Sequence, residues 1–179
     1  GGHRQTRAYH NIGMTYSELK NWAEAANFFK KASIAAEELN DKALHCVSTL
    51  GLAEAYARLG RLRESEELCE RGLAGVRARE DKLSLADGYK ILGLVRAKKK
   101  LYEEAADLFD KGIQIAKGLN NQLQQAEGLR ELGLMLKDKG DVKAAAEALT
   151  KARDIFKAIR AEENAAEVEG ELKFHEPVK

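Results

Sequence analysis

Apolar residues recur at helical spacing along this chain, in stripes separated by short polar breaks. Within residues 81–120, Leu85, Leu92 and Val95 belong to one stripe, and Leu108 and Ile115 belong to a second one. Stripes with a period near 3.6 residues predict amphipathic α-helices. The block therefore predicts two helices of about 16–18 residues joined by a tight turn.

Small residues repeat in register every 40 positions and mark four copies of this unit. The first set is Gly13, Ala53, Gly93 and Gly133; the second is Ala25, Ser65, Ala105 and Ala145; the third is Ala32, Gly72, Gly112 and Ala152. Such a period indicates a helical array in which small side chains allow helix axes to approach closely. We predict repeats at about 1–40, 41–80, 81–120 and 121–160. Gly88 is expected to lie off these contacts and to tolerate alanine.

The last part of the chain follows a different pattern. Ala165 and Val168 continue a narrow apolar stripe, whereas Glu169 and Lys173 are charged at registers that are apolar or small elsewhere. A terminal helix that covers the last repeat has this composition. We predict a capping helix at about 161–175, and we expect residues 174–179 to form a frayed tail.

Residues 9–32 resemble the tetratricopeptide repeat (TPR). The matching positions are Tyr9, Ile12, Gly13, Tyr16, Trp22, Ala25, Phe29 and Ala32, and in residues 129–152 they are Leu132, Gly133, Gly140, Ala145 and Ala152. The family's closing proline is replaced by Glu37, Arg77, Lys117 and Lys157. The unit thus resembles the long-helix branch found in Pins-type adaptors and bacterial Rap-type proteins. The resemblance implies an all-α fold: one array over residues 1–179, a right-handed α-α superhelix of four helix pairs with a C-terminal capping helix.

In this family the first helix of each pair lines a concave face on which ligands lie. By register, the candidate groove residues here are Arg7, His10, Met14, Leu50, Glu54, Lys90, Leu94, Arg130, Leu134 and Lys137. Apolar side chains among cations suit a peptide or helix that carries apolar and acidic groups. Ordinary exposed residues of amphipathic helices are the competing interpretation.

These features favour a protein–protein interaction scaffold. The alternative is a regulatory, self-associating or spacer module of a larger signalling protein. Lys plus Arg (30) nearly equal Asp plus Glu (29), which argues against a nucleic-acid or membrane partner. The four histidines and two cysteines lack metal-ligand spacing, and no cofactor motif or catalytic constellation is evident. We therefore expect a cytoplasmic protein that is not an enzyme and needs no metal or cofactor; the sequence leaves its oligomeric state open.

Overall fold

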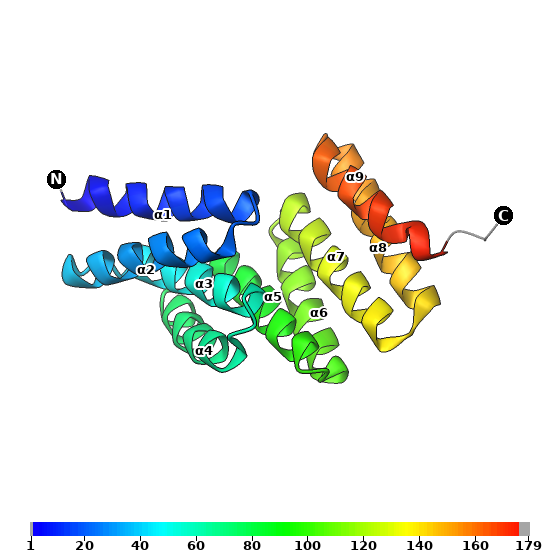
Figure 1. Cartoon of the computed structure of the whole chain (residues 1–179), viewed down its shortest axis with the longest axis horizontal. Helices are drawn as coiled ribbons and strands as arrows, with labels where there is room; N and C mark the ends of the chain where they lie inside the picture. The colour runs from blue at the N-terminus through cyan, green and yellow to red at the C-terminus, as the bar shows by residue number, and fades with distance from the viewer. Residues whose placement is uncertain (1, 176–179) are drawn as a thin grey trace. The chain divides into compact units, whose positions relative to one another are not determined.

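Every regular element in the described part of the chain is helical. The computed structural model describes residues 2–175, which contain nine α-helices and a final 3-10 turn (Figure 1). The elements are α1 Gly2–Glu18, α2 Trp22–Glu38, α3 Lys42–Arg58, α4 Leu62–Ala78, α5 Lys82–Lys98, α6 Tyr102–Gly118, α7 Gln122–Lys139, α8 Val142–Ala158, α9 Glu162–Glu171 and η1 Leu172–His175. The all-α class and the predicted sequence of helix pairs are confirmed.

The turns between helices share one backbone geometry. A residue with φ between 54° and 97° ends each turn, at Lys20, Asn40, Gly60, Glu80, Lys100, Asn120, Gly140 and Arg160. A left-handed residue lets the next N–H groups bond to carbonyls of the finished helix, as Asn21 N does to the Tyr16 carbonyl at 2.9 Å. Because this residue recurs every 20 positions, seven of the nine α-helices in the described residues are 17 residues long.

Side-chain caps fix the starts of several first helices. The Asp41 Oδ1 accepts a hydrogen bond from the Leu44 N–H at 3.0 Å, and the Asn121 Oδ1 accepts one from the Gln124 N–H at 3.0 Å. Asp81 performs the same function at the start of α5, where it accepts from the Ser84 N–H. These contacts satisfy donors that have no partner within the helix.

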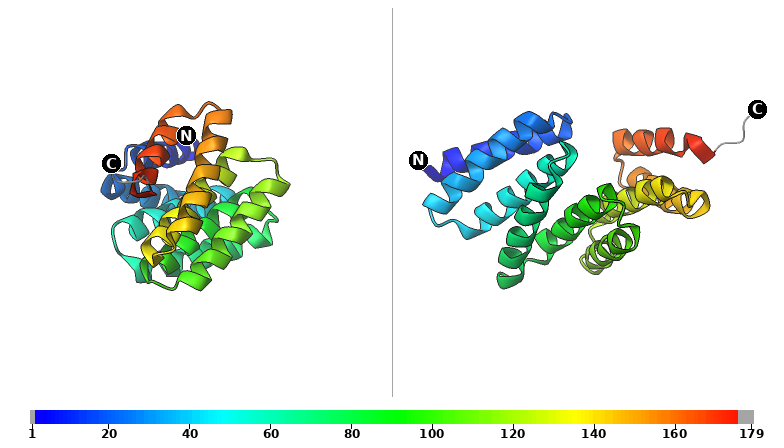
Figure 2. Two further views of the ribbon diagram at one scale, coloured as in Figure 1. Left: turned by 90° about the vertical axis from the view of Figure 1, so that its right-hand side faces the viewer. Right: turned by 60° about the horizontal axis from the view of Figure 1, so that its bottom comes forward.

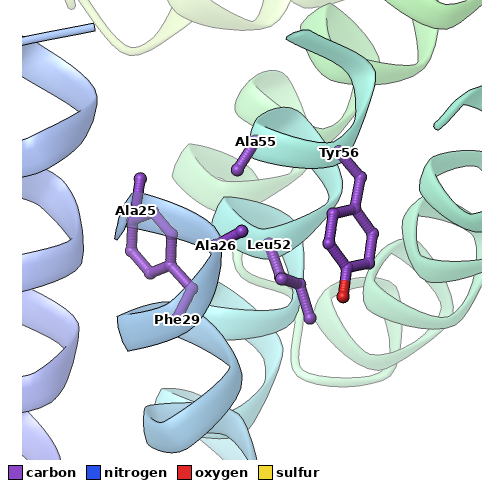
Figure 3. Close-up of a cluster of buried hydrophobic side chains, with 6 residues drawn as sticks. All are labelled: Ala25, Ala26, Phe29, Leu52, Ala55 and Tyr56. Atoms are coloured by element: carbon purple, nitrogen blue, oxygen red, sulfur yellow. The ribbon is translucent and has the colours of Figure 1, made fainter. Parts of the chain in front are cut away.

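The chain divides into two compact units, Gly1–Val95 and Arg96–Lys179, and the boundary falls inside α5. In unit 1, Phe29 of α2 packs in a cluster with Leu52 and Tyr56 of α3 (Figure 3). Gly13 of α1 leaves room for this ring, because a Cβ at Gly13 would lie 2.8 Å from the Phe29 Cδ1. The predicted role of the small residues in close packing therefore holds in the first repeat.

In unit 2, too, small residues leave room for the bulky side chains of the core clusters. Phe109 of α6 packs with Met135 of α7, and Leu149 of α8 belongs to a second cluster with Phe156 and with residues of α9. A Cβ at Gly133 would lie 2.6 Å from the Leu149 Cγ. The equivalent glycines of α1 and α7 thus occupy equivalent contacts within their own units. That all four repeats form one array remains a prediction.

Gly88 lies on a helix contact, contrary to expectation. It is buried, and a Cβ there would lie 2.5 Å from the Leu73 Cδ2. Gly128 has the same relation to Ile113, whose Cγ1 would be 2.8 Å away. A first helix therefore needs small residues on the side facing the preceding second helix as well as on the side facing its own partner.

The C-terminal part is more ordered than the sequence suggested. The helix α9 folds back along α8 (Figure 2). Ala165 and Val168 are buried in the cluster that the two helices share. The predicted frayed tail is wrong for residues 174–175, because Leu172–His175 form a 3-10 turn. Leu172 and Phe174 pack against the same cluster, and this apolar contact holds the turn in place. Residues 176–179 of that prediction lie outside the described residues.

Candidate interaction surface

The candidate residues lie on the four first helices α1, α3, α5 and α7. We call the ten positions Arg7, His10, Met14, Leu50, Glu54, Lys90, Leu94, Arg130, Leu134 and Lys137 the first-helix set. Their environments differ from helix to helix, although each falls at a register shared by the four first helices.

On α1, Arg7 and Met14 face solvent, and the Met14 side chain keeps 48% of its area exposed. His10 is half-buried: its ring lies 5.4 Å from that of Phe29, and its Nδ1 shares a hydrogen bond of 2.9 Å with the Ser48 Oγ of α3. Burial lowers the pKa of His10 below its ordinary value. Arg7 and Met14 are therefore open to a partner, whereas His10 contributes mainly to packing.

On α3, Leu50 belongs to the core and not to an open face. It is only 2% exposed, and its Cδ2 occupies the space where a Cβ of Gly72 would stand. Glu54 is partly exposed and lies 3.8 Å from Arg58 in the same helix. The expectation that Leu50 lines an open groove is wrong, because α4 packs over that position.

On α5, Leu94 is likewise buried, with 8% of its area exposed, in a cluster with Ala57 and Val95. Lys90 is partly buried, and its Nζ lies 3.2 Å from the Asp87 carboxylate one turn earlier. The expectation of an exposed Leu94 is wrong, because this side chain packs against Ala57 of α3. An internal first helix is flanked by neighbours, so register alone does not show which positions stay open.

On α7, Arg130 is held by two carboxylates from α9. Its Nε and Nη2 donate to the two oxygens of Glu171 at 2.7 and 3.1 Å, and Nη2 also lies 3.3 Å from Glu167. Arg130 and Glu171 are only 26% and 21% exposed. Burial alone would lower the pKa of Arg130, but the hydrogen bond and charge of Glu171 outweigh it and raise that pKa.

The other two α7 candidates face the same segment. The Lys137 Nζ lies 4.7 Å from the centre of the Phe174 ring, within the range of a cation–π contact. Leu134 packs on the cluster that also receives Leu172 and Phe174. The structure thus brings Arg130, Leu134 and Lys137 together around the residues Glu167–Phe174.

Sequence reasoning missed the acidic and aromatic residues that complete this contact. It treated Phe174 as part of a tail and gave Glu167 and Glu171 no role. One signal was available, because Glu167 and Glu171 are four residues apart and lie on one face of a helix. That signal was ambiguous, since Glu169 of the same helix contacts Lys157 of α8 instead, at 2.7 Å.

Among residues 2–175, no group of three or more His, Cys, Asp or Glu side chains is arranged to hold a metal ion. Both cysteines are buried as free thiols, and burial raises the pKa of the Cys46 thiol. No helix in the described range is long and apolar enough to cross a membrane.

Comparison with known protein families identifies the family to which this chain belongs. The profile described as Tetratricopeptide repeat matches residues 4–78 and 44–117. The chain belongs to the tetratricopeptide repeat family. Comparison with curated proteins gave no match.

Several solved structures have a similar fold. A Rap protein in complex with Competence and Sporulation Factor is 20% identical with a TM-score of 0.84, over 96% of this chain and 48% of that one. The Pyrococcus horikoshii STAND protein with a tetratricopeptide repeat sensor is 18% identical with a TM-score of 0.69, over 94% of this chain and 26% of that one. BtubC from P. vanneervenii is 16% identical with a TM-score of 0.60, over 90% and 76% of the two chains.

The chain spans about half the length of the Rap protein that it matches. At these identities the likeness shows the fold: sequential helix pairs in a TPR-like solenoid. This chain is a TPR domain by fold and family, and TPR domains are in general protein-interaction modules.

Proposed function

We propose that this TPR domain binds partner segments through cations and apolar side chains of the first-helix set, with one candidate surface on α1 and a separate one on α7. The partner segment is a peptide or helix that carries acidic and apolar residues. The proposal keeps Arg7, Met14, Arg130, Leu134 and Lys137 as contact residues. It assigns Leu50 and Leu94 to the core.

The observation that carries the proposal is the contact around Arg130. A guanidinium and an ammonium on α7 hold two carboxylates and an aromatic ring of the chain's own C-terminal segment. Paired, partly buried contacts of this kind are stronger than exposed ion pairs. The face of α7 is therefore chemically suited to an acidic and aromatic segment.

Two further facts support the proposal. On α1, Met14 offers an exposed apolar side chain two helical turns from the exposed cation Arg7 and on the same face of the helix. Among proteins of similar fold, the Rap protein was solved in complex with Competence and Sporulation Factor. Neither fact names the partner, and the chemistry of the exposed side chains defines its class.

The test is selection from a random peptide-display library on the full chain. We expect enrichment of peptides that combine acidic and apolar residues. The affinity of a selected peptide should fall with added salt but persist in part, because apolar contacts are not screened. Arg7→Glu/Met14→Asp should weaken peptides bound to α1 at least tenfold.

A matched control is available on α2. Lys30→Glu/Ile34→Asp makes the same two changes at exposed positions, and Ile34 is 50% exposed, close to the value for Met14. This control should leave peptide affinity unchanged. The proposal is contradicted if the selected peptides show no acidic and apolar preference, or if neither the α1 variant nor Arg130→Gln weakens any of them.

Self-association is the second candidate, and exposed apolar residues away from the first-helix set favour it. Leu19 is 69% exposed and Ile34 is 50% exposed. Sedimentation of the wild-type chain and of Lys30→Glu/Ile34→Asp distinguishes the two functions. A wild-type dimer that becomes monomeric in this variant would assign the α2 surface to assembly.

A further inference from the structure

The C-terminal segment is attached to unit 2 in two different ways. The body of α9 is anchored by Ala165 and Val168, which are 4% and 0% exposed in the cluster shared with α8. The end of the segment, residues 171–174, is held by partly exposed contacts: the Glu171 pair with Arg130, the Phe174 ring beside Lys137, and the packing of the partly buried Leu172 and Phe174 on the edge of that cluster. We call residues 171–174 the cover.

A glycine separates the anchor from the cover. Gly170 is exposed, and a Cβ there would meet no atom within 4 Å, so no packing contact requires a glycine at this place. Glycine weakens a helix by roughly 0.5–1 kcal/mol relative to alanine because it loses more backbone entropy on folding. Gly170 therefore weakens the helix between its buried anchor and the cover, which allows residues 171–174 to detach locally while the preceding part of α9 stays docked.

The cover occupies the α7 side chains that the proposed function assigns to a partner. We propose that residues 171–174 are a displaceable cover over α7, and that a partner segment with a carboxylate and an aromatic residue takes their place on Arg130, Leu134 and Lys137. This inference rests on the proposed function and deepens it, because it names the contact chemistry and makes access to α7 conditional.

Tethering gives the cover its advantage. A segment attached next to its site acts at an effective concentration in the mM range, so a free peptide with the same contacts competes poorly. A natural partner then needs additional contacts, or a change that weakens the cover. Loss of either the Glu171 carboxylate or the Phe174 ring should therefore increase binding to α7, although each removes a contact within the chain.

The first experiment needs no ligand. Hydrogen exchange of the full chain should show that Glu171→Gln speeds exchange of the amides of residues 171–174 at least tenfold. The amides of residues 165–168 should change less than twofold. Glu163→Gln, an exposed position of α9 with the same change in charge, is the control and should alter neither group. Joint acceleration of both groups would overturn the proposal, because the cover would not detach separately.

The second experiment uses a labelled peptide with the sequence of residues 167–175. Glu171→Gln/Phe174→Ala should bind it at least tenfold more tightly than the wild-type chain, and adding Arg130→Gln should abolish that gain. Equal affinity of the wild-type chain and the double variant, or binding by neither, would overturn the proposal and make the cover a structural end to the domain. The proposed function on α1 would survive that outcome, because Arg7→Glu/Met14→Asp tests it independently.

Discussion

The helices α1 and α7 carry equivalent residues in different surroundings. Gly13 and Gly133 each accommodate a bulky residue of the following second helix, Phe29 and Leu149 respectively. One position further on, Met14 is largely exposed, whereas Leu134 packs beneath the C-terminal segment. The pairing within each repeat is thus the same, and the exposure of the first helix is not.

The exposure differs because the helix that packs next to each one, α3 beside α1 and α9 beside α7, brings different side chains to the contact. On α1, His10 meets the small hydroxyl of Ser48 on α3, and the neighbouring surface at Met14 stays open. On α7, Arg130 at the register of His10 meets the long carboxylate Glu171 of α9, and the turn after it continues over Lys137. For α1 and α7, the exposure of the first helix is therefore decided by residues about 40 positions later.

The largest expected effect separates a core position from an exposed one at the same register. Leu94→Asp places a carboxylate in the cluster with Ala57 and Val95 and should destabilise the protein by about 4 kcal/mol or more. Met14→Asp, at an exposed position, should change stability by no more than about 0.5 kcal/mol. Urea unfolding followed by circular dichroism measures both changes.

Leu134→Asp should fall between these two values, because Leu134 is only partly buried. If Leu94→Asp unfolds no more readily than Met14→Asp, position 94 faces solvent and the open groove expected from the sequence is restored. The three variants together measure how far burial varies along one register.

The sequence was sufficient for the helices and for their pairing. The 40-residue period, the caps at Asp41 and Asn121, and the close approach at Gly13 are local features that one sequence records directly. Whether a side chain is exposed depends on contacts with other helices, which the neighbouring sequence does not record. Leu50 and Leu94 have the register of surface residues, and they are buried because other helices pack over them, α4 over Leu50 and α3 against Leu94. The cover was missed for the same reason, since its contacts join Arg130 to a residue 41 positions away.

A smaller effect on stability is expected at the glycines that occupy the same register in α1 and α7. Gly133→Ala should destabilise by about 2 kcal/mol, because the added Cβ meets the Leu149 Cγ at 2.6 Å and its backbone N at 3.2 Å. Gly13→Ala should cost about 1 kcal/mol, because the obstacle is the Phe29 ring alone. Thermal or urea unfolding of the two variants gives the order.

Gly118→Ala is the control for both, because a Cβ at the end of α6 meets nothing within 4 Å. It should be neutral or gain up to about 0.5 kcal/mol from alanine's better helix propensity. A loss at Gly13 larger than that at Gly133 would show that the aromatic ring is less able to move than the backbone of α8.

The smallest expected effect is a pH dependence of stability that comes from His10 of α1. Arg130, at the same register on α7, keeps its charge at all ordinary pH values. Burial lowers the pKa of His10 from the 6.5 of an exposed imidazole. The unfolded chain then binds a proton at a higher pH than the folded chain does, so His10 favours folding fully above about pH 6.5. This contribution is lost as the pH falls through the lowered pKa of the folded state. Urea unfolding at about pH 7.5 and pH 5 should show less loss of stability on acidification in His10→Asn than in the wild-type chain. An identical loss in both would mean that His10 is as well hydrated in the folded protein as in the unfolded one, and that α1 is more open than its contacts with Phe29 and Ser48 indicate.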